Sequence, residues 1–274
     1  MPRRAITLAA LCFSLAFAAR AEPAQRVVSL NPSLTAMALA LGARAQLVGV
    51  DDFSARQEPA ARDLTRVGGL YDSSLEAVVA LRPDLVMLVP SAEQRSFQEQ
   101  LAALGIRRFV ADPTSYDEVL ATIRAVGSEL GREREAAARV AQLRAARERA
   151  EAASARRPRV RALLVLQRDP LFVAGAGTFV DDMLRAAGAD NIATELPGTW
   201  PRGSREWLLA AKPEVILDST DEPEPAAEFW ARWPSLRARV VSLPAGAVTL
   251  PGPYLDRALA LIEAALHPQT AAAP

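Results

Sequence analysis

Two segments of this chain align with each other without a gap, and this internal similarity is the strongest constraint on the fold. Residues 74–86 (SLEAVVALRPDLV) lie over residues 204–216 (SREWLLAAKPEVI), so that Ser, Glu, Ala, a basic residue, Pro and an acid recur in order. A weaker pair is formed by 41–43 and 187–189, each with a Gly that closes an expected helix. Helix–Pro–strand units resemble one another in many α/β proteins, and this is the alternative explanation. The shared Glu favours two copies of one lobe.

Apolar runs of strand length alternate with helical patterns on both sides of the chain centre, which is typical of parallel α/β sheets. In the first half, strands are expected at 26–30, 47–50, 85–89 and 108–110, with helices at 34–42, 73–81 and 93–104. In the second half, strands are expected at 160–166, 215–217 and 239–243, with helices at 179–187, 204–211 and 254–266.

The segment between these halves differs in composition, because residues 132–157 are rich in Ala, Arg, Glu and Leu and contain neither Pro nor Gly. Such residues favour one long helix, about 35–40 Å in length at 1.5 Å per residue. Its polarity predicts a solvated spacer. We therefore expect an α/β protein in which two Rossmann-like lobes with central parallel sheets are joined by a single long α-helix, and the cleft between them is a natural ligand site.

The N-terminus has the three parts of a secretory signal peptide, with Arg3 and Arg4, an apolar run, and a cleavage site near Ala21. Cys12 lies inside the apolar run, so cleavage would leave an exported chain without cysteine. From residue 267 onward we expect a frayed end. The predicted segments are a signal peptide (1–21), an N-terminal lobe (22–131), a bridging helix (132–157), a C-terminal lobe (158–268) and a disordered tail (269–274).

Composition excludes several classes of function. The 32 cations balance 32 acids, so nucleic-acid binding is not expected. A single Cys and a single His provide no disulfide and no multi-histidine metal site. No nucleophile is placed with a base and no G-x-S-x-G occurs, which makes an exported hydrolase or transferase the weaker alternative. Gly175-Ala176-Gly177 lacks the third Gly of a dinucleotide-binding loop.

A few residues stand out as candidate site residues. Trp200 lies in a loop rich in Gly, Pro and Thr, whereas Phe53, Tyr71 and Phe172 follow strands or turns and could equally be packing residues. Glu76 and Glu206 occupy equivalent positions near two helix starts. The helix dipole favours carboxylates in a first turn, which is enough to explain both residues, and Ser73 with Glu76 fits a capping box. The alternative is that the two carboxylates, one on each lobe, form ion pairs with cationic residues of a partner protein.

From Arg26 to Leu266 the chain resembles the substrate-binding proteins of ABC importers for cobalamin, siderophores and haem. The resemblance is carried by five stretches of sequence: 26–35, 47–50, 75–86, 188–192 and 200–206. The run Trp200-Pro201-Arg202-Gly203-Ser204-Arg205-Glu206 is similar to the Trp-Pro-x-x-Ser-Arg-Glu of cobalamin-binding members. Haem-binding members place an axial Tyr directly after Val-Gly, where this chain has Gly69, so the resemblance favours cobalamin over haem.

The resemblance implies a periplasmic carrier that captures cobalamin or a related corrinoid between its lobes and delivers it to a membrane permease with its ATPase. A ferric siderophore or haem is the alternative cargo. No catalysis, resident cofactor, metal, nucleic acid or membrane insertion is implied, and a monomer with little lobe motion is expected. Six residues are expected to contact the ligand: Trp200, Phe53, Tyr71, Phe172, Arg168 and Arg202. Glu76 and Glu206 are expected to contact permease arginines.

Overall fold

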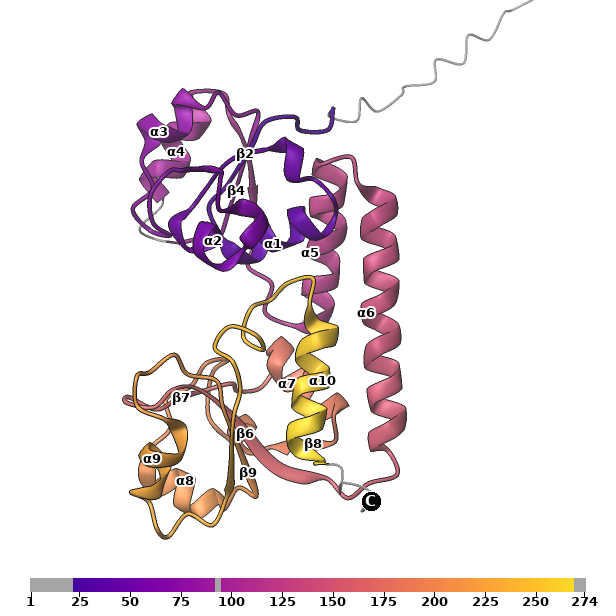
Figure 1. The fold of residues 1–274 in the computed structure, drawn as a ribbon, viewed down its shortest axis with the longest axis vertical. Coiled ribbons are helices and arrows are strands. Elements are labelled where there is room, and N and C mark those ends of the chain that lie inside the picture. The colour runs from indigo at the N-terminus through magenta and orange to yellow at the C-terminus, as the bar shows by residue number, and fades with distance from the viewer. Residues whose placement is uncertain (1–21, 92–94, 269–274) are drawn as a thin grey trace, which may run out of the picture.

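The structure is a computed structural model that describes residues 22–91 and 95–268. It consists of two α/β lobes, one above the other, beside a pair of long helices (Figure 1). The N-terminal lobe is built on a five-stranded parallel sheet of order β3-β2-β1-β4-β5. Its strands are β1 (Val27–Ser29), β2 (Leu47–Val50), β3 (Thr65–Arg66), β4 (Leu85–Leu88) and β5 (Arg107–Val110).

Helices cover both faces of this sheet, so its central strands are continuous apolar runs. Along β4, Leu85 and Met87 join one core cluster while Val86 and Leu88 join another. The helices of this lobe are α1 (Pro32–Ala40), α2 (Asp52–Gln57), α3 (Leu75–Ala80) and α4 (Arg95–Ala103). Short 3-10 helices lie at Arg44–Gln46 and Pro59–Ala61 in this lobe, and a third lies at Ile192–Glu195 in the C-terminal lobe of the described chain.

The C-terminal lobe has a sheet of order β10-β9-β6-β7, with β8 also paired to β6. All of its pairings are parallel except that of β7, which is antiparallel to β6. The prediction of two α/β lobes with parallel sheets is confirmed, with one antiparallel edge strand added. The elements are β6 (Val160–Gln167), β7 (Phe172–Val173), α7 (Phe179–Ala186), β8 (Ala189–Asn191), α8 (Arg205–Ala211), β9 (Val215–Asp218), α9 (Ala226–Ala231), β10 (Arg239–Ser242) and α10 (Leu255–Leu266).

The internal repeat is visible in individual hydrogen bonds. Ser74 Oγ accepts from Ala77 N at the start of α3, as Ser204 Oγ accepts from Trp207 N at the start of α8. Ser74 therefore caps α3, and the predicted capping box of Ser73 with Glu76 is wrong by one residue, since Ser73 donates to Gly69 O instead.

The strands that follow these two helices are anchored in the same way. Asp84 accepts from the backbone N of Arg26, whereas Glu214 accepts from the backbone N of Arg161. The side chains of the two arginines also donate to the end of each helix. Arg26 donates to Leu81 O at 2.7 Å, and Arg161 donates to Ala211 O at 2.6 Å. Each lobe therefore fastens its helix–strand unit to the start of its central strand by matching contacts.

Two antiparallel helices, α5 (Tyr116–Glu129) and α6 (Glu133–Ser154), run along the side of both lobes (Figure 1). The 22 residues of α6 bury Ala136, Val140, Leu143 and Ala150. Most of the helix is solvated, as expected, but these four residues form a buried row, and α6 packs on α5, α7 and α10. One core cluster runs from Val27 in the first lobe to Leu266 in the last helix.

The segment 244–254, between β10 and α10, reaches from the C-terminal lobe to the N-terminal one. Pro251 O accepts a hydrogen bond from the Ser33 hydroxyl, and Val248 is fully buried. Arg139 of α6 donates to Pro253 O at 2.6 Å and pairs with Asp256 at 2.6 Å. We call residues 244–254 the strap, because it ties the two lobes together at the base of the space between them.

The end of the described chain is fixed rather than frayed as far as His267, whose Nε2 lies 2.9 Å from Ala187 O. The predicted signal peptide (1–21) and tail (269–274) lie outside the described residues. Within the described part, no helix has the length and apolar character needed to cross a membrane.

Candidate functional site

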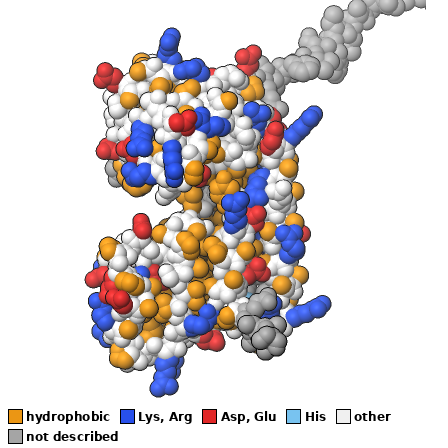
Figure 2. Space-filling model, in the orientation of Figure 1, with side chains coloured by type: hydrophobic (Ala, Val, Ile, Leu, Met, Phe, Trp, Pro, Cys, Tyr) orange, Lys and Arg blue, Asp and Glu red, His pale blue; other side chains and the backbone are white. Residues whose placement is uncertain are grey.

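The space between the lobes is hollowed on the side away from α6 (Figure 2). A pocket of about 520 Å³ lies there at the carboxyl ends of the N-terminal strands, where open α/β sheets usually hold ligands. We call it the cleft pocket. Its walls come from segments that follow β1, β3, β4 and β5 and from the strap: Asn31, Ser33, Leu34, Tyr71, Val89, Pro90, Ser91, Ala111, Asp112, Pro113, Leu250 and Pro251.

Two of the predicted aromatic contacts are on the N-terminal lobe and are exposed. Tyr71 is 60% exposed and lines the cleft pocket. Phe53 is 44% exposed in the first turn of α2, and the Arg56 guanidinium lies 4.4 Å from its ring centre. Tyr71 is thus placed to contact a ligand in the cleft pocket, whereas Phe53 is exposed but does not line that pocket.

The position of Phe53 depends on a buried polar group below it. Asp51 is fully buried and caps α2 by accepting from Phe53 N at 2.8 Å and Ser54 N at 2.9 Å. Ser54 also donates to Asp51 and is linked through Thr35 to Ser29. Burial raises the pKa of Asp51 against the opposing effect of these hydrogen bonds. This network fixes the start of α2.

Trp200 is on the C-terminal lobe and is 38% exposed. Its ring meets Phe179 edge-on, with centroids 6.1 Å apart. Phe179 N donates at 2.6 Å to Thr114 O, next to Pro113 of the cleft pocket. The Trp200 side chain therefore packs on the first residue of α7, whose backbone is bonded to the segment that leads into α5.

The loop that carries Trp200 needs a glycine beside it. Gly175 N donates to Thr199 O at 2.8 Å, and a Cβ at Gly175 would lie only 2.6 Å from Gly198 O. The Gly175-Ala176-Gly177 turn thus allows the Trp200 loop to approach β7. This close approach explains the glycine at 175, and no bound nucleotide is needed to explain it.

Phe172 and Arg202 face each other across an isolated bridge between β7 and the Trp200 loop. Phe172 is half-buried and Arg202 is exposed. Arg202 does not line the cleft pocket but a second pocket of about 740 Å³, formed only by the C-terminal lobe. We call this the arginine pocket. It is lined by Arg168, Asp169, Pro170, Leu171, Arg202, Gly203, Ser204, Arg205, Phe229, Arg232 and Trp233.

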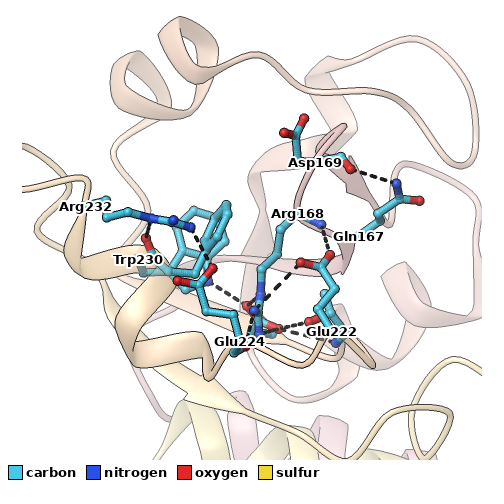
Figure 3. A network of polar contacts seen from close by, with 10 residues as sticks. Gln167, Arg168, Asp169, Glu222, Glu224, Trp230 and Arg232 are labelled. Carbon is cyan, nitrogen blue, oxygen red and sulfur yellow. Dashed lines mark hydrogen bonds and ion pairs between the residues drawn. The ribbon is translucent and has the colours of Figure 1, made fainter.

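Arg168 does not fit the expected role of a ligand contact. Its side chain is 3% exposed, and its Nε and Nη2 lie 2.9 and 3.2 Å from the two Asp218 oxygens. Its other nitrogen donates to Glu224 O (Figure 3). This guanidinium is used in holding the loop after β9 against the end of β6. Arg168 is a positioning residue for the wall of the arginine pocket.

The carboxylate of Asp218 is the centre of that network. It also accepts from Trp230 Nε1 at 2.6 Å and from the Thr220 hydroxyl at 2.8 Å. Burial opposes its ionisation, but the hydrogen bonds from Arg168, Trp230 and Thr220 outweigh burial and lower the pKa of Asp218. Asp218 therefore stays charged, and Arg168 neutralises it.

Glu76 and Glu206 are both exposed in the first turns of α3 and α8. These helices lie on the two lobes on the side away from α6 (Figure 1). The pKa of Glu206 is lowered by its own backbone N–H and by the Ser204 hydroxyl. The two carboxylates are available to a partner on the open side of the molecule.

Several residues of the site could not be recognised in the sequence. Leu250 and Pro251 enter the cleft pocket only because the strap crosses between lobes. Among the described residues, no group of three or more His, Cys, Asp or Glu side chains is arranged to hold a metal ion. The cleft pocket is lined by the Tyr71 ring, by hydroxyl and backbone groups, and by the carboxylate of Asp112.

Comparisons with known proteins agree with this architecture. Residues 27–229 match the family model described as periplasmic binding protein. The vitamin B12-binding protein of Yersinia pseudotuberculosis is 30% identical over 245 residues, which cover 89% of this chain and 85% of that protein.

Solved structures have the same fold. The periplasmic vitamin B12 binding protein of Vibrio cholerae superposes with a TM-score of 0.76 at 24% identity, covering 89% of this chain and 97% of that one. A periplasmic haem-binding protein from Pseudomonas aeruginosa has a TM-score of 0.76 at 29% identity, covering 90% and 94%. The likeness to the Vibrio protein shows the fold alone. Taken with the family match, these findings show that the chain belongs to the periplasmic binding protein family.

Proposed function

We propose that this chain is exported to the periplasm, captures cobalamin or a related corrinoid between its lobes, and delivers it to an ABC permease. The observation that carries the proposal is the exposed Tyr71 ring on the wall of the cleft pocket, together with the exposed rings of Phe53 and Trp200, which do not line that pocket. Phe53 and Tyr71 on one lobe and Trp200 on the other offer apolar surface to a bulky planar ligand. The 30% identity to vitamin B12-binding proteins supports the corrinoid.

In this proposal the chain works as a carrier and not as an enzyme. Cobalamin is the cargo, and no resident cofactor takes part. Phe172 lies at the edge of the Trp200 loop and serves as a rim contact. Glu76 and Glu206 dock the loaded carrier on permease arginines, and the carrier acts as a monomer.

Haem is a second candidate ligand, and one observation favours it. Tyr71 places an exposed phenol on the wall of the cleft pocket, and phenolate oxygen is an established axial ligand of haem iron. The 29% identity to the Pseudomonas haem-binding protein supports the same reading. A ferric siderophore remains the third candidate.

Titration of the purified mature chain with cyanocobalamin, hemin and ferrichrome distinguishes these ligands. We expect a saturable calorimetric signal and a shift in the visible spectrum with cyanocobalamin. A response to hemin alone, lost in Tyr71→Phe, would replace the corrinoid with haem. Binding of none of the three would overturn the proposed ligand classes.

A further inference from the structure

The arginine pocket lies beside the proposed docking carboxylate and apart from the cleft pocket. All of its walls belong to the C-terminal lobe, and they include Ser204 and Arg205, the two residues that precede Glu206. With about 740 Å³ it exceeds the cleft pocket in volume, and none of its wall residues is shared with that pocket.

Four arginines line this pocket, but only two of them are neutralised within the lobe. Arg168 is paired with Asp218, and Arg232 lies 2.8 Å from Glu224. Arg202 and Arg205 are exposed, and no carboxylate of the described residues lies within ion-pair distance of either. Asp169 is the one acid among the wall residues, and the acids behind the wall (Asp218, Glu222 and Glu224) pair with Arg168 and Arg232. The positive charge without an ion pair therefore lies on Arg202 and Arg205.

The pocket is also built to hold these cations in place. The Arg205 guanidinium lies 4.9 Å from the Trp233 ring centre, and Arg232 lies 4.7 Å from that of Phe229. Gly203 N donates to Leu171 O at 2.9 Å, and the ion pair with Asp218 fixes Arg168 in the wall. A guanidinium stacked on a ring keeps its N–H donors free at the edge, where they suit a carboxylate.

We propose that the arginine pocket receives an acidic side chain of the permease, beside the contact made by Glu206. The proposal rests on the proposed function, because it assumes that Glu206 meets the permease. A permease surface carrying only arginines would attract Glu206 but be repelled by Arg205 next to it. Complementarity therefore requires an acid opposite the pocket.

The internal repeat shows that this contact belongs to one lobe. In the same register, the N-terminal lobe has Asp72 and Leu75 where the C-terminal lobe has Arg202 and Arg205. Glu76 and Glu206 are thus common to both lobes, whereas the cationic contact is not. Each lobe presents a different pattern of charge to the permease, and this difference distinguishes the two ends of the carrier.

The test compares Arg205→Glu with Arg237→Glu, a matched reversal at an exposed arginine of the same lobe outside the pocket. Docking of the cyanocobalamin-loaded carrier is measured by biolayer interferometry on the permease–ATPase complex that supports its uptake, held in nanodiscs. We expect Arg205→Glu to weaken docking at least tenfold and Arg237→Glu less than twofold. Arg205→Gln should lie between them, and cyanocobalamin affinity should be unchanged in all three.

Glu206→Gln separates the pocket from its neighbour. If Arg205 acts only by orienting Glu206, Arg205→Glu has no further effect in the Glu206→Gln background, and the proposal is overturned. Unchanged docking of Arg205→Glu, or a loss of cyanocobalamin affinity in that variant, also overturns it. Wild-type protein that binds cyanocobalamin but no permease complex would instead contradict the proposed function itself.

Discussion

Arg82 and Lys212 adopt nearly the same left-handed backbone conformation, with φ of 47° and 48°. They occupy the same position in the two repeated units, after α3 and α8 and directly before a proline. They are the two non-glycine residues with positive φ in the described chain. This shared turn sets the path from helix to strand in both lobes, and it places Glu76 and Glu206 at matching points of the two helices.

Replacing Lys212 by Gly should stabilise the protein. The left-handed conformation costs a residue with a Cβ roughly 1–2 kcal/mol, and the larger unfolded-state entropy of Gly offsets about half of that gain. We expect the free energy of unfolding to rise by about 0.5–1 kcal/mol in urea denaturation. Lys212→Ala retains the Cβ and should show no gain, and equal effects of the two substitutions would contradict this explanation.

Removal of both docking carboxylates should separate capture from transport. Glu76→Ala with Glu206→Ala should abolish uptake of labelled ligand in cells while leaving the affinity of the purified chain unchanged, because both side chains are exposed away from the cleft pocket. Glu135→Ala, in the first turn of α6, is the matched control. A fall in ligand affinity in the double variant would show that these residues belong to the ligand site.

Trp200→Ala should weaken ligand binding by about 2–3 kcal/mol, the usual effect of removing a central aromatic contact. Its 38% exposure limits the loss of packing against Phe179, so the free energy of unfolding should change by less than about 1 kcal/mol. Calorimetric titration and urea denaturation give the two values. Leu261→Ala, at a residue of the same lobe that is 36% exposed, should leave affinity unchanged.

Arg168→Met should destabilise the fold by about 3–5 kcal/mol, because it leaves the Asp218 carboxylate buried without its cation. Arg168→Met with Asp218→Asn should recover part of that loss. Since the folded pKa of Asp218 is lowered, the stability from its ionised form is present above its usual pKa of 3.8 and lost as the pH falls further. The difference between wild type and Arg168→Met should therefore shrink below about pH 3.8, and a constant difference would argue against the ion pair.

Ligand binding should move the lobes very little. The strap is tied to the N-terminal lobe through Ser33 and to α6 through Arg139, so a hinge closure would break both contacts. Small-angle scattering of the free and loaded chain should give superimposable profiles. A clear contraction on addition of ligand would contradict this expectation.

The repeated pattern of helix, proline and strand was enough to predict the architecture, because local periodicity and turn residues decide those elements. The internal contacts of Arg168 could not be predicted, because its partners Asp218 and Glu224 are distant in the sequence and nothing near Arg168 indicates that they meet it. The polarity of α6 was misleading for a similar reason. Alanines at Ala136 and Ala150 allow close helix packing without giving the segment an apolar composition.

The candidate aromatics were found because each interrupts the apolar pattern at a loop or turn. Leu250 and Pro251 were missed because only the path of the strap brings them to the cleft pocket. The ligand-contact and docking roles of the candidate residues stay predictions until ligand and permease are tested.

The core that runs from Val27 through α5 and α6 to Leu266 has a consequence for folding. Each lobe has a core cluster of its own. The largest cluster is shared, since it joins Tyr116, Val140 and Leu143 to residues of both lobes. The chain should thus melt in one cooperative transition, and either half expressed alone should expose this interior and aggregate. The two lobes, although similar in sequence, should therefore not fold independently of each other.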